Sequence, residues 1–155
     1  MSTESDLLST MRGGSPYANL CGLRVLIVDD NRDGANSLGD LLAICGGTIH
    51  VRYNGQTALE AISALAPEVV ILDLSLPDMN GCSVAAHVRA TDRSGGPFLI
   101  ALTGHADDTT RERVAQCGFD MHFLKPVDPG DLLHAIGGRL RGAAAAGTSG
   151  AHSGA

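Results

Sequence analysis

The chain has 155 residues, of which 44% are hydrophobic and 18% charged, and its formal net charge is -6. This length and composition indicate one globular domain with its own core, and they exclude an extensively disordered chain. The acidic balance disfavours a nucleic-acid-binding surface, which normally carries a basic patch. No apolar run approaches the roughly 18 residues that a membrane-spanning helix needs, so we expect no membrane partner.

The two ends of the chain differ from its middle. Residues 1–22 are rich in Ser, Gly and Asn, and residues 142–155 contain only small residues and one His. Neither end can bury enough apolar area to offset the entropy of ordering, so we predict a flexible N-terminal tail and a disordered Gly/Ala tail. The N-terminus also lacks the basic start and the apolar stretch of a signal peptide, which favours a cytoplasmic protein.

Residues 23–141 alternate between short apolar runs and apolar residues at helical spacing, which predicts strands and helices in turn. The first half contains a strand at Arg24–Val28, a helix with the stripe Leu38–Cys45, a strand at Thr48–Arg52, a helix that ends at Pro67 and a strand at Val69–Leu72. The second half contains a helix around Val84–Val88, a strand at Phe98–Leu102, a polar helix at 107–117, a strand at Met121–Leu124 and a helix with the stripe Leu132–Leu140.

Five apolar strands that alternate with five helices indicate a parallel sheet covered on both faces. Right-handed crossovers then give a doubly wound, flavodoxin-like α/β fold. In such sheets, ligands bind beyond the carboxyl ends of the strands, so the residues that follow each strand are the candidate functional residues.

Polar side chains follow four of the predicted strands. Asp29 and Asp30 follow the first strand, Asp73 the third, Thr103 the fourth and Lys125 the fifth. Two carboxylates about 4 Å apart repel by about 4 kcal/mol at an effective dielectric near 20, so three of them need a cation. Oxygen ligands favour Mg²⁺ over Zn²⁺, and a carboxylate beside Mg²⁺ can attack a phosphoryl group. This edge of the sheet therefore predicts the formation and hydrolysis of an aspartyl phosphate.

The segments VLIVDDN, VVILDLSLPDMNG, ALTGHA and GFDMHFLKPVDP resemble the signature segments of two-component receiver domains. The resemblance covers residues 23–141 and includes four motifs in the expected order. It implies a signalling domain that is no enzyme beyond its own phosphorylation and dephosphorylation. Its phosphodonor would be a histidine kinase or a histidine phosphotransfer protein, and its downstream target a protein.

The resemblance assigns the acidic residues to two roles. Asp73 resembles the phosphoacceptor, which makes it the expected phosphorylation site. Asp30 matches a direct Mg²⁺ ligand, and Asp29 matches the acidic neighbour that acts on the metal through water. Ser75 matches the residue whose backbone carbonyl completes the metal site with Asp73.

The remaining motif residues belong to catalysis and switching. Thr103 and Lys125 resemble the hydroxyl and the ammonium that complete the catalytic set with Asp73, and Thr103 is also the switch hydroxyl. The second switch position commonly holds Tyr or Phe and here holds His122, whose ring is smaller. The Lys125–Pro126 peptide bond is expected to be cis. The segment around Lys125 resembles receivers of hybrid kinases more than those of DNA-binding regulators. Because the sequence predicts neither a kinase nor an output domain, we expect a stand-alone phosphoryl carrier or partner-binding switch.

The polar residues at the strand ends are also compatible with different roles. Asp29, Asp30 and Asn31 could act only as helix caps. A haloacid-dehalogenase-like phosphatase also places an Asp after an apolar strand, but its second acid is replaced by Ser75 here. A flavodoxin-type binding module needs a phosphate-binding loop after the first strand, where Asp29 and Asp30 would repel phosphate. A degenerate receiver is disfavoured because every catalytic position is filled.

The four cysteines, Cys21, Cys45, Cys82 and Cys117, are separated by 24, 37 and 35 positions and include no C-x-x-C pair. Such spacing is typical neither of a metal site nor of a small disulfide scaffold. We therefore expect reduced and mostly buried thiols.

Overall fold

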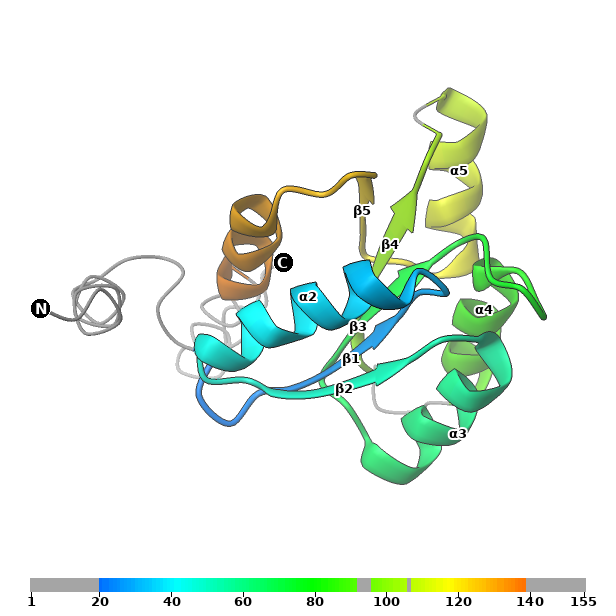
Figure 1. Ribbon diagram of the computed structural model, residues 1–155. Coiled ribbons are helices and arrows are strands. Elements are labelled where there is room, and N and C mark those ends of the chain that lie inside the picture. Colours follow the sequence, from blue (N-terminus) through cyan, green and yellow to red (C-terminus); the bar gives the residue numbers. More distant parts are fainter. Residues whose placement is uncertain (1–19, 92–95, 106, 139–155) are drawn as a thin grey trace, which may run out of the picture.

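The computed structural model describes residues 20–91, 96–105 and 107–138 (Figure 1). Five parallel strands form one sheet in the order β2-β1-β3-β4-β5. The strands are β1 (Arg24–Val28), β2 (Thr48–Arg52), β3 (Val69–Asp73), β4 (Phe98–Thr103) and β5 (Met121–Leu124). The helices are α2 (Arg32–Ile44), α3 (Gly55–Leu65), α4 (Gly81–Thr91) and α5 (Asp108–Cys117), and a last helix occupies residues 129–138.

The predicted doubly wound α/β fold is confirmed. The predicted strands agree with the observed ones, except that β3 and β4 each continue for one more residue. Asp73 is the last residue of β3, where it pairs with Leu102, and Thr103 is the last residue of β4, where it pairs with Leu124. Among the helices that the structure describes, none is long and apolar enough to cross a membrane.

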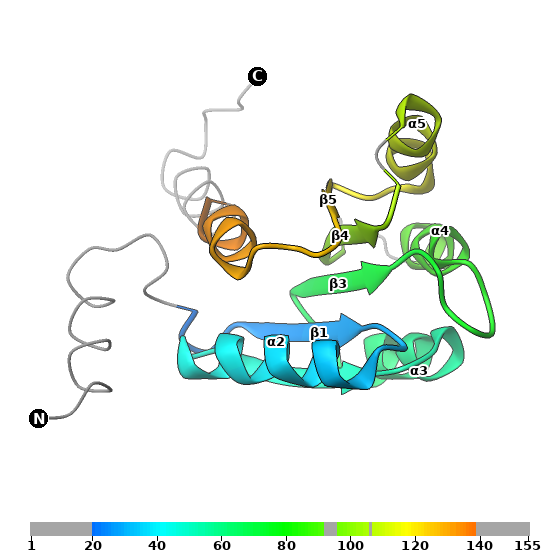
Figure 2. The ribbon, with the colours of Figure 1, turned by 45° about the horizontal axis from the view of Figure 1, so that its top comes forward.

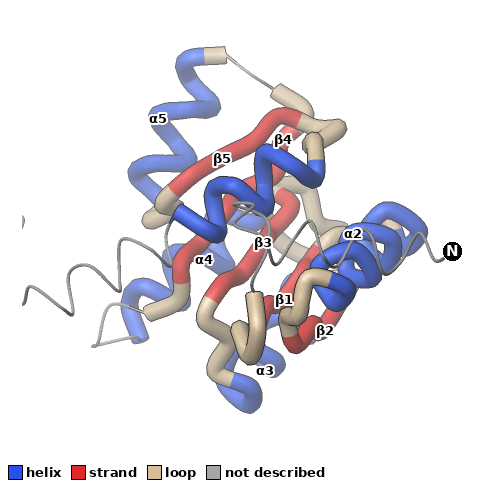
Figure 3. The backbone as a smooth tube through the Cα atoms, turned by 90° about the vertical axis from the view of Figure 1, so that its left-hand side faces the viewer, coloured by secondary structure: helices blue, strands red, loops and turns tan. Residues whose placement is uncertain are grey.

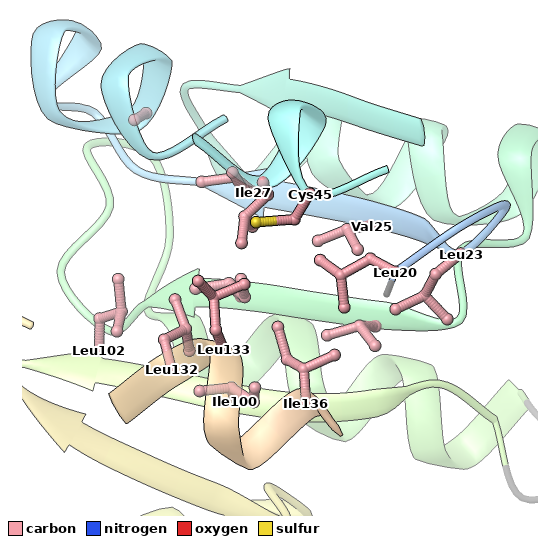
Figure 4. Close-up of a cluster of buried hydrophobic side chains, with 14 residues drawn as sticks. Leu20, Leu23, Val25, Ile27, Cys45, Ile100, Leu102, Leu132, Leu133 and Ile136 are labelled. Carbon is pink, nitrogen blue, oxygen red and sulfur yellow. The ribbon is translucent and has the colours of Figure 1, made fainter. Parts of the chain in front are cut away.

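Helices cover both faces of the sheet (Figures 2 and 3). Side chains of α2 and of the last helix pack on one face in a cluster that includes Ile27, Leu42 and Leu132 (Figure 4). Side chains of α3, α4 and α5 pack on the other face. All five residues of β3 are buried, because this central strand is covered on both sides. The strand therefore carries Asp73 to a fixed point at the edge of the core.

Three helices begin at side chains of the type that favours helix N-termini. Asn31 accepts a hydrogen bond from the Gly34 amide at the start of α2, at 3.1 Å. Asn54 and Asp107 play the same part for α3 and α5. Each cap satisfies an amide that has no partner within its own helix.

The loop between β3 and α4 is bound to the start of α3 by a carboxylate. Asp78 accepts hydrogen bonds from the amides of Gly55 and Gln56, at 2.7 and 2.9 Å. These backbone bonds lower the pKa of the Asp78 carboxyl, because they stabilise its charged form. The loop that follows Asp73 is thus held against a neighbouring helix.

The same loop is closed at its base by backbone contacts. The Gly81 amide donates to the Leu74 carbonyl at 2.9 Å, and Ser75 pairs with Asn80 in an isolated antiparallel bridge. A Cβ atom on Gly81 would lie 2.6 Å from the Asp73 carbonyl oxygen. The start of α4 therefore packs directly on the backbone of Asp73.

Part of the predicted N-terminal tail belongs to the packed domain. Leu20 is only 2% exposed, and its amide donates to the Cys45 carbonyl at 3.0 Å. The packed part of the chain thus begins three residues before the predicted boundary at residue 23. Residues 1–19 of the predicted N-terminal tail, and all of the predicted Gly/Ala tail, lie outside the described residues.

The prediction of reduced, mostly buried cysteines is wrong for part of the set. Cys82 in α4 and Cys117 in α5 form a disulfide, with their Cα atoms 5.3 Å apart. Cys45 keeps a buried thiol and Cys21 an exposed one. Spacing along the sequence does not show that two positions on neighbouring helices face each other, and this geometry decides whether a disulfide forms.

Substitution of Gly81 by Ala tests how tightly α4 packs on the backbone around Asp73. The new Cβ would lie 2.6 Å from the Asp73 oxygen and 2.8 Å from the Leu74 Cα, so the backbone would have to shift. We expect Gly81→Ala to lower the free energy of unfolding by about 1–3 kcal/mol. Gly104→Ala is the control, since no heavy atom lies within 4 Å of its added Cβ. Urea denaturation of both variants measures the effect, and equal midpoints would contradict the packing argument.

Candidate functional site

Three carboxylates meet at the carboxyl edge of the sheet. Oxygen atoms of Asp29, Asp30 and Asp73 all lie within 4.8 Å of one another, close enough to hold one metal ion. Asp29 is 5% exposed and Asp73 is 4% exposed, whereas Asp30 is open to solvent. The cluster therefore has a buried floor formed by β1 and β3 and one accessible carboxylate.

The Lys125 ammonium lies between the two buried carboxylates. Its Nζ atom is 3.1 Å from Oδ2 of Asp29 and 3.1 Å from Oδ2 of Asp73. The residue is held at the end of β5, because its amide donates to the Thr103 carbonyl at 2.7 Å. The Lys125–Pro126 peptide bond that follows is cis. One ammonium balances only one of the three carboxylates, so the cluster keeps an excess of negative charge.

Local backbone bonds orient the two buried carboxylates. Oδ1 of Asp29 accepts from the Asn31 amide, and Oδ1 of Asp73 accepts from the Ser75 amide, both at 3.0 Å. Each carboxylate thus accepts a hydrogen bond from a backbone amide of its own loop with one oxygen and contacts the Lys125 ammonium with the other. This arrangement fixes both groups in orientations that face the same space.

The environment shifts the pKa of two of these groups. Burial raises the pKa of the Asp73 carboxyl, and the nearby charge of Asp29 adds to the increase. Hydrogen bonds from Ser75 and Lys125 oppose the increase without cancelling it. Burial alone would lower the pKa of Lys125, but its hydrogen bonds to Asp29 and Asp73 raise it overall. The ammonium therefore stays charged, and the Asp73 carboxyl is harder to ionise in the folded protein than an exposed aspartate would be.

The capping role considered for the acidic residues belongs to their neighbour. Asn31 is the residue that caps α2. Asp29 accepts from the Asn31 amide, and Asp30 is the residue between them. Capping therefore accounts for Asn31 and leaves Asp30 and the second oxygen of Asp29 facing the acidic cluster.

The other predicted site residues, Thr103, Ser75 and His122, lie on the strand ends and loops around this cluster. Thr103 is buried at the end of β4, and its Oγ accepts from the His105 amide at 3.1 Å. Ser75 is exposed and contacts Asp73 through its amide. His122 is half-buried in β5, where it pairs with Ala101. The acids and Lys125 thus form the centre of the site, and Thr103 adjoins it through the backbone of Lys125.

Sequence reasoning missed two residues that position the site. Asp78 anchors the loop after Asp73, and Gly81 lets α4 approach the Asp73 backbone. The turn-forming segment LSLPDMNG signalled a loop, but its bonds to α3 depend on a partner more than 20 positions away. Only the folded arrangement shows that contact.

An open parallel α/β sheet with acids and a lysine at its carboxyl edge defines a class of phosphoryl-accepting signalling domains. Residues 25–137 match the family model described as the response regulator receiver domain. The chain belongs to this family. Phosphorylation and magnesium binding are general features of the family, and its members act in two-component systems.

Individual relatives agree with this membership. The DNA-binding response regulator MtrA of Mycobacterium tuberculosis is 36% identical over 118 residues, which are 76% of this chain and 50% of MtrA. An uncharacterized 14.6 kDa protein of Leptolyngbya boryana is 29% identical over 117 residues, which cover 76% of this chain and 89% of that protein. The chain thus spans about half the length of its mycobacterial relatives.

Solved structures agree as well. A CheY-like receiver domain protein from Methanospirillum hungatei superposes with a TM-score of 0.72 at 28% identity, covering 77% of this chain and 94% of that one. A receiver domain described as BeF3-activated DrrB gives a TM-score of 0.70 at 25% identity, with 77% and 98% covered. The similarity therefore extends along nearly the whole length of both neighbours.

Replacement of Asp73 by Asn tests the electrostatic state of the site. A raised pKa means that ionisation of Asp73 destabilises the folded state, fully above its folded-state pKa and not at all below about 3.9. We expect Asp73→Asn to be more stable than wild type near neutral pH, by about 1 kcal/mol. This gain should disappear as the pH falls toward about 4. Urea denaturation in EDTA at several pH values measures it.

Asp78→Asn is the control, because its effect on the free energy of unfolding should be opposite to that of Asp73→Asn. The pKa of Asp78 is lowered, so its charged form stabilises the fold at neutral pH, and that stabilisation is lost as the pH falls through its folded-state pKa. This variant should be less stable than wild type near neutral pH. If Asp73→Asn behaved like Asp78→Asn, the account of a desolvated carboxylate at Asp73 would be wrong.

Proposed function

We propose that this chain is a single-domain response regulator that accepts a phosphoryl group on Asp73 in a Mg²⁺-dependent reaction. The phosphodonor is a histidine kinase or a histidine phosphotransfer protein, and the phosphorylated domain switches partner binding in a phosphorelay. The observation that carries the proposal is the position of Asp73. Its buried carboxylate lies within 4.8 Å of two other acids and 3.1 Å from the Lys125 ammonium.

The proposed metal ligands are oxygen atoms. The carboxylates of Asp30 and Asp73 and the backbone carbonyl of Ser75 form a set that suits Mg²⁺, with Asp29 acting through a bound water. The excess negative charge of the cluster supports a divalent cation in particular. When bound, Mg²⁺ neutralises charge on the oxygens of the phosphoryl group during transfer.

The proposed phosphoryl transfer uses the Asp73 carboxylate as nucleophile and Lys125 as its neighbouring cation. An Asp73 carboxylate oxygen attacks the phosphorus atom, the new O–P bond forms, and the bond from phosphorus to the donor histidine nitrogen breaks. Lys125 contacts Asp73 before the reaction and is positioned to hold a phosphoryl oxygen after it. Hydrolysis of the acyl phosphate by water returns Asp73 to its carboxylate form.

The proposed switch uses the charge that the reaction adds. A phosphoryl group brings about -1.5 to -2 charge units at neutral pH. The Thr103 hydroxyl, which now interacts with His105, would move to the phosphoryl group, and His122 on the neighbouring strand would respond. This movement would alter the surface formed by α5, β5 and the last helix.

The proposed partners are proteins of the cytoplasm. The net charge of -6 disfavours a nucleic-acid surface on this domain. For that reason the proposed output of this domain is a protein contact, although its relative MtrA is a DNA-binding response regulator.

Phosphorylation by a small-molecule donor tests the chemistry directly. With acetyl phosphate and Mg²⁺, we expect the intact protein to gain the mass of one acid-labile phosphoryl group, because Asp73 is the buried nucleophile of the site. Asp73→Asn should gain none, and Lys125→Ala should respond more weakly. Intact-mass spectrometry measures the gain, and labelling of Asp73→Asn to the wild-type level would overturn the assignment.

Substitution of Asp30 tests the metal site. Asp30→Asn removes one charge from the acidic cluster, so in EDTA it should be at least as stable as wild type. Millimolar Mg²⁺ should raise the melting temperature of wild type and not that of Asp30→Asn, because a ligand that binds only the folded state stabilises it. Asp33→Asn is a matched control on α2 that should keep the Mg²⁺ response. Loss of the response in both variants, or in neither, would contradict the proposed ligand set.

A further inference from the structure

The disulfide between Cys82 and Cys117 joins two helices at a position that matters for the site. Cys82 is the second residue of α4, and Cys117 is the last residue of α5. Both residues are half-buried and pack against the hydrophobic cluster on that face of the sheet. The bridge is therefore a partly accessible link between α4 and α5, which lie next to each other (Figure 1).

One end of this link adjoins the acidic site. Cys82 follows Gly81, whose amide donates to the Leu74 carbonyl and which leaves no room for a Cβ atom beside the Asp73 backbone. A displacement of Cys82 thus acts on the loop that follows Asp73. The bridge adds a covalent connection between this end of α4 and the C-terminal end of α5.

The other end holds a helix that is otherwise weakly packed. Within α5, all of which the structure describes, Val114 is the only fully buried residue. A single buried side chain supplies little of the apolar contact that normally fixes a helix. Arg89 of α4 adds contacts just beyond α5, since its Nε atom donates to the Gly118 carbonyl and its Nη2 atom pairs with Asp120, both at 2.8 Å. Without the bridge, the C-terminal end of α5 would be held by these polar contacts and by two buried side chains, Val114 and Phe119.

We propose that Cys82 and Cys117 form a reversible disulfide whose reduction releases α5 from α4. In the cytoplasm proposed above, disulfides are typically transient and redox-sensing, which favours a reversible role over a structural one. A low-molecular-weight thiol attacks one sulfur, the S–S bond breaks, and a mixed disulfide forms. A second thiol resolves it, so two protein thiols and one low-molecular-weight disulfide result, and the protons come from the attacking thiols. Oxidation is the reverse reaction.

The bridge also has a consequence for phosphorylation, and this part rests on the proposed function. The proposed switch requires α5 to respond when Thr103 moves toward the phosphoryl group. A covalent link at Cys117 restrains that response, whereas the reduced protein is free to make it. The oxidised and reduced forms therefore differ in how far a signal from Asp73 reaches α5.

The first experiment tests the redox pair itself. The full chain is equilibrated with glutathione disulfide or with dithiothreitol, alkylated after denaturation and weighed by mass spectrometry. The oxidised sample should carry two alkyl groups and the reduced sample four, with peptide mapping assigning the difference to Cys82 and Cys117. Four alkyl groups in both samples, or two in both, would overturn a reversible bridge.

The second experiment tests what the bridge holds. Hydrogen exchange of residues 108–117 should become several-fold faster after reduction, whereas α3 should be unchanged. The variant with both Cys82→Ser and Cys117→Ser should exchange like the reduced protein with or without dithiothreitol. Cys21→Ser, which alters an exposed cysteine outside the bridge, should keep the wild-type response to dithiothreitol. Equal exchange of α5 in the two redox forms would overturn the proposed release.

The third experiment adds beryllofluoride, a phosphoryl mimic, with Mg²⁺. Amide spectra should shift near Asp73 in both redox forms, but shifts within α5 should be larger in the reduced protein. Shifts near Asp73 with equal responses of α5 would overturn the link between redox state and switching. No shift near Asp73 would count against the proposed function and this link, while the alkylation and exchange results would still decide whether the bridge is reversible and holds α5.

Discussion

The contact of one ammonium with two buried carboxylates is the interaction on which the site depends. Lys125 reaches both Asp29 and Asp73 at 3.1 Å, and each of these acids comes from the end of a different strand. The contact therefore ties β1, β3 and β5 together at one edge. It is also incomplete, because a third carboxylate shares the same space. A site of this kind holds its parts in place while keeping a strong attraction for cations.

The rest of the fold serves to keep these charges at the boundary between core and solvent. β3 is buried along its whole length and ends at Asp73, so the carboxylate cannot retreat into water without disrupting the strand. The loop after it is fixed by Asp78 and by the amide of Gly81. Apolar packing on both faces of the sheet compensates for the cost of keeping a carboxylate buried at this position.

Much of this arrangement could be predicted from the sequence, because it depends on local patterns. Apolar runs and helical spacing identified the strands and helices, and the rule that ligands bind at the carboxyl edge brought Asp29, Asp30, Asp73 and Lys125 together. Contacts between distant segments could not be predicted in this way. The Cys82–Cys117 bridge and the bonds of Asp78 depend on how helices face one another, and spacing along the chain carries no record of that. Strand ends were short by one residue because Asp73 and Thr103 are polar, yet their backbones still pair.

The anchoring of the loop after Asp73 also limits how this protein can change in length. Surface loops usually tolerate inserted or deleted residues, since few contacts fix their path. Between Leu74 and Gly81, however, the chain must reach the start of α3 through Asp78 and return to its own base. One added residue would displace one of these anchors. In this segment, therefore, length and not only residue type is under structural constraint.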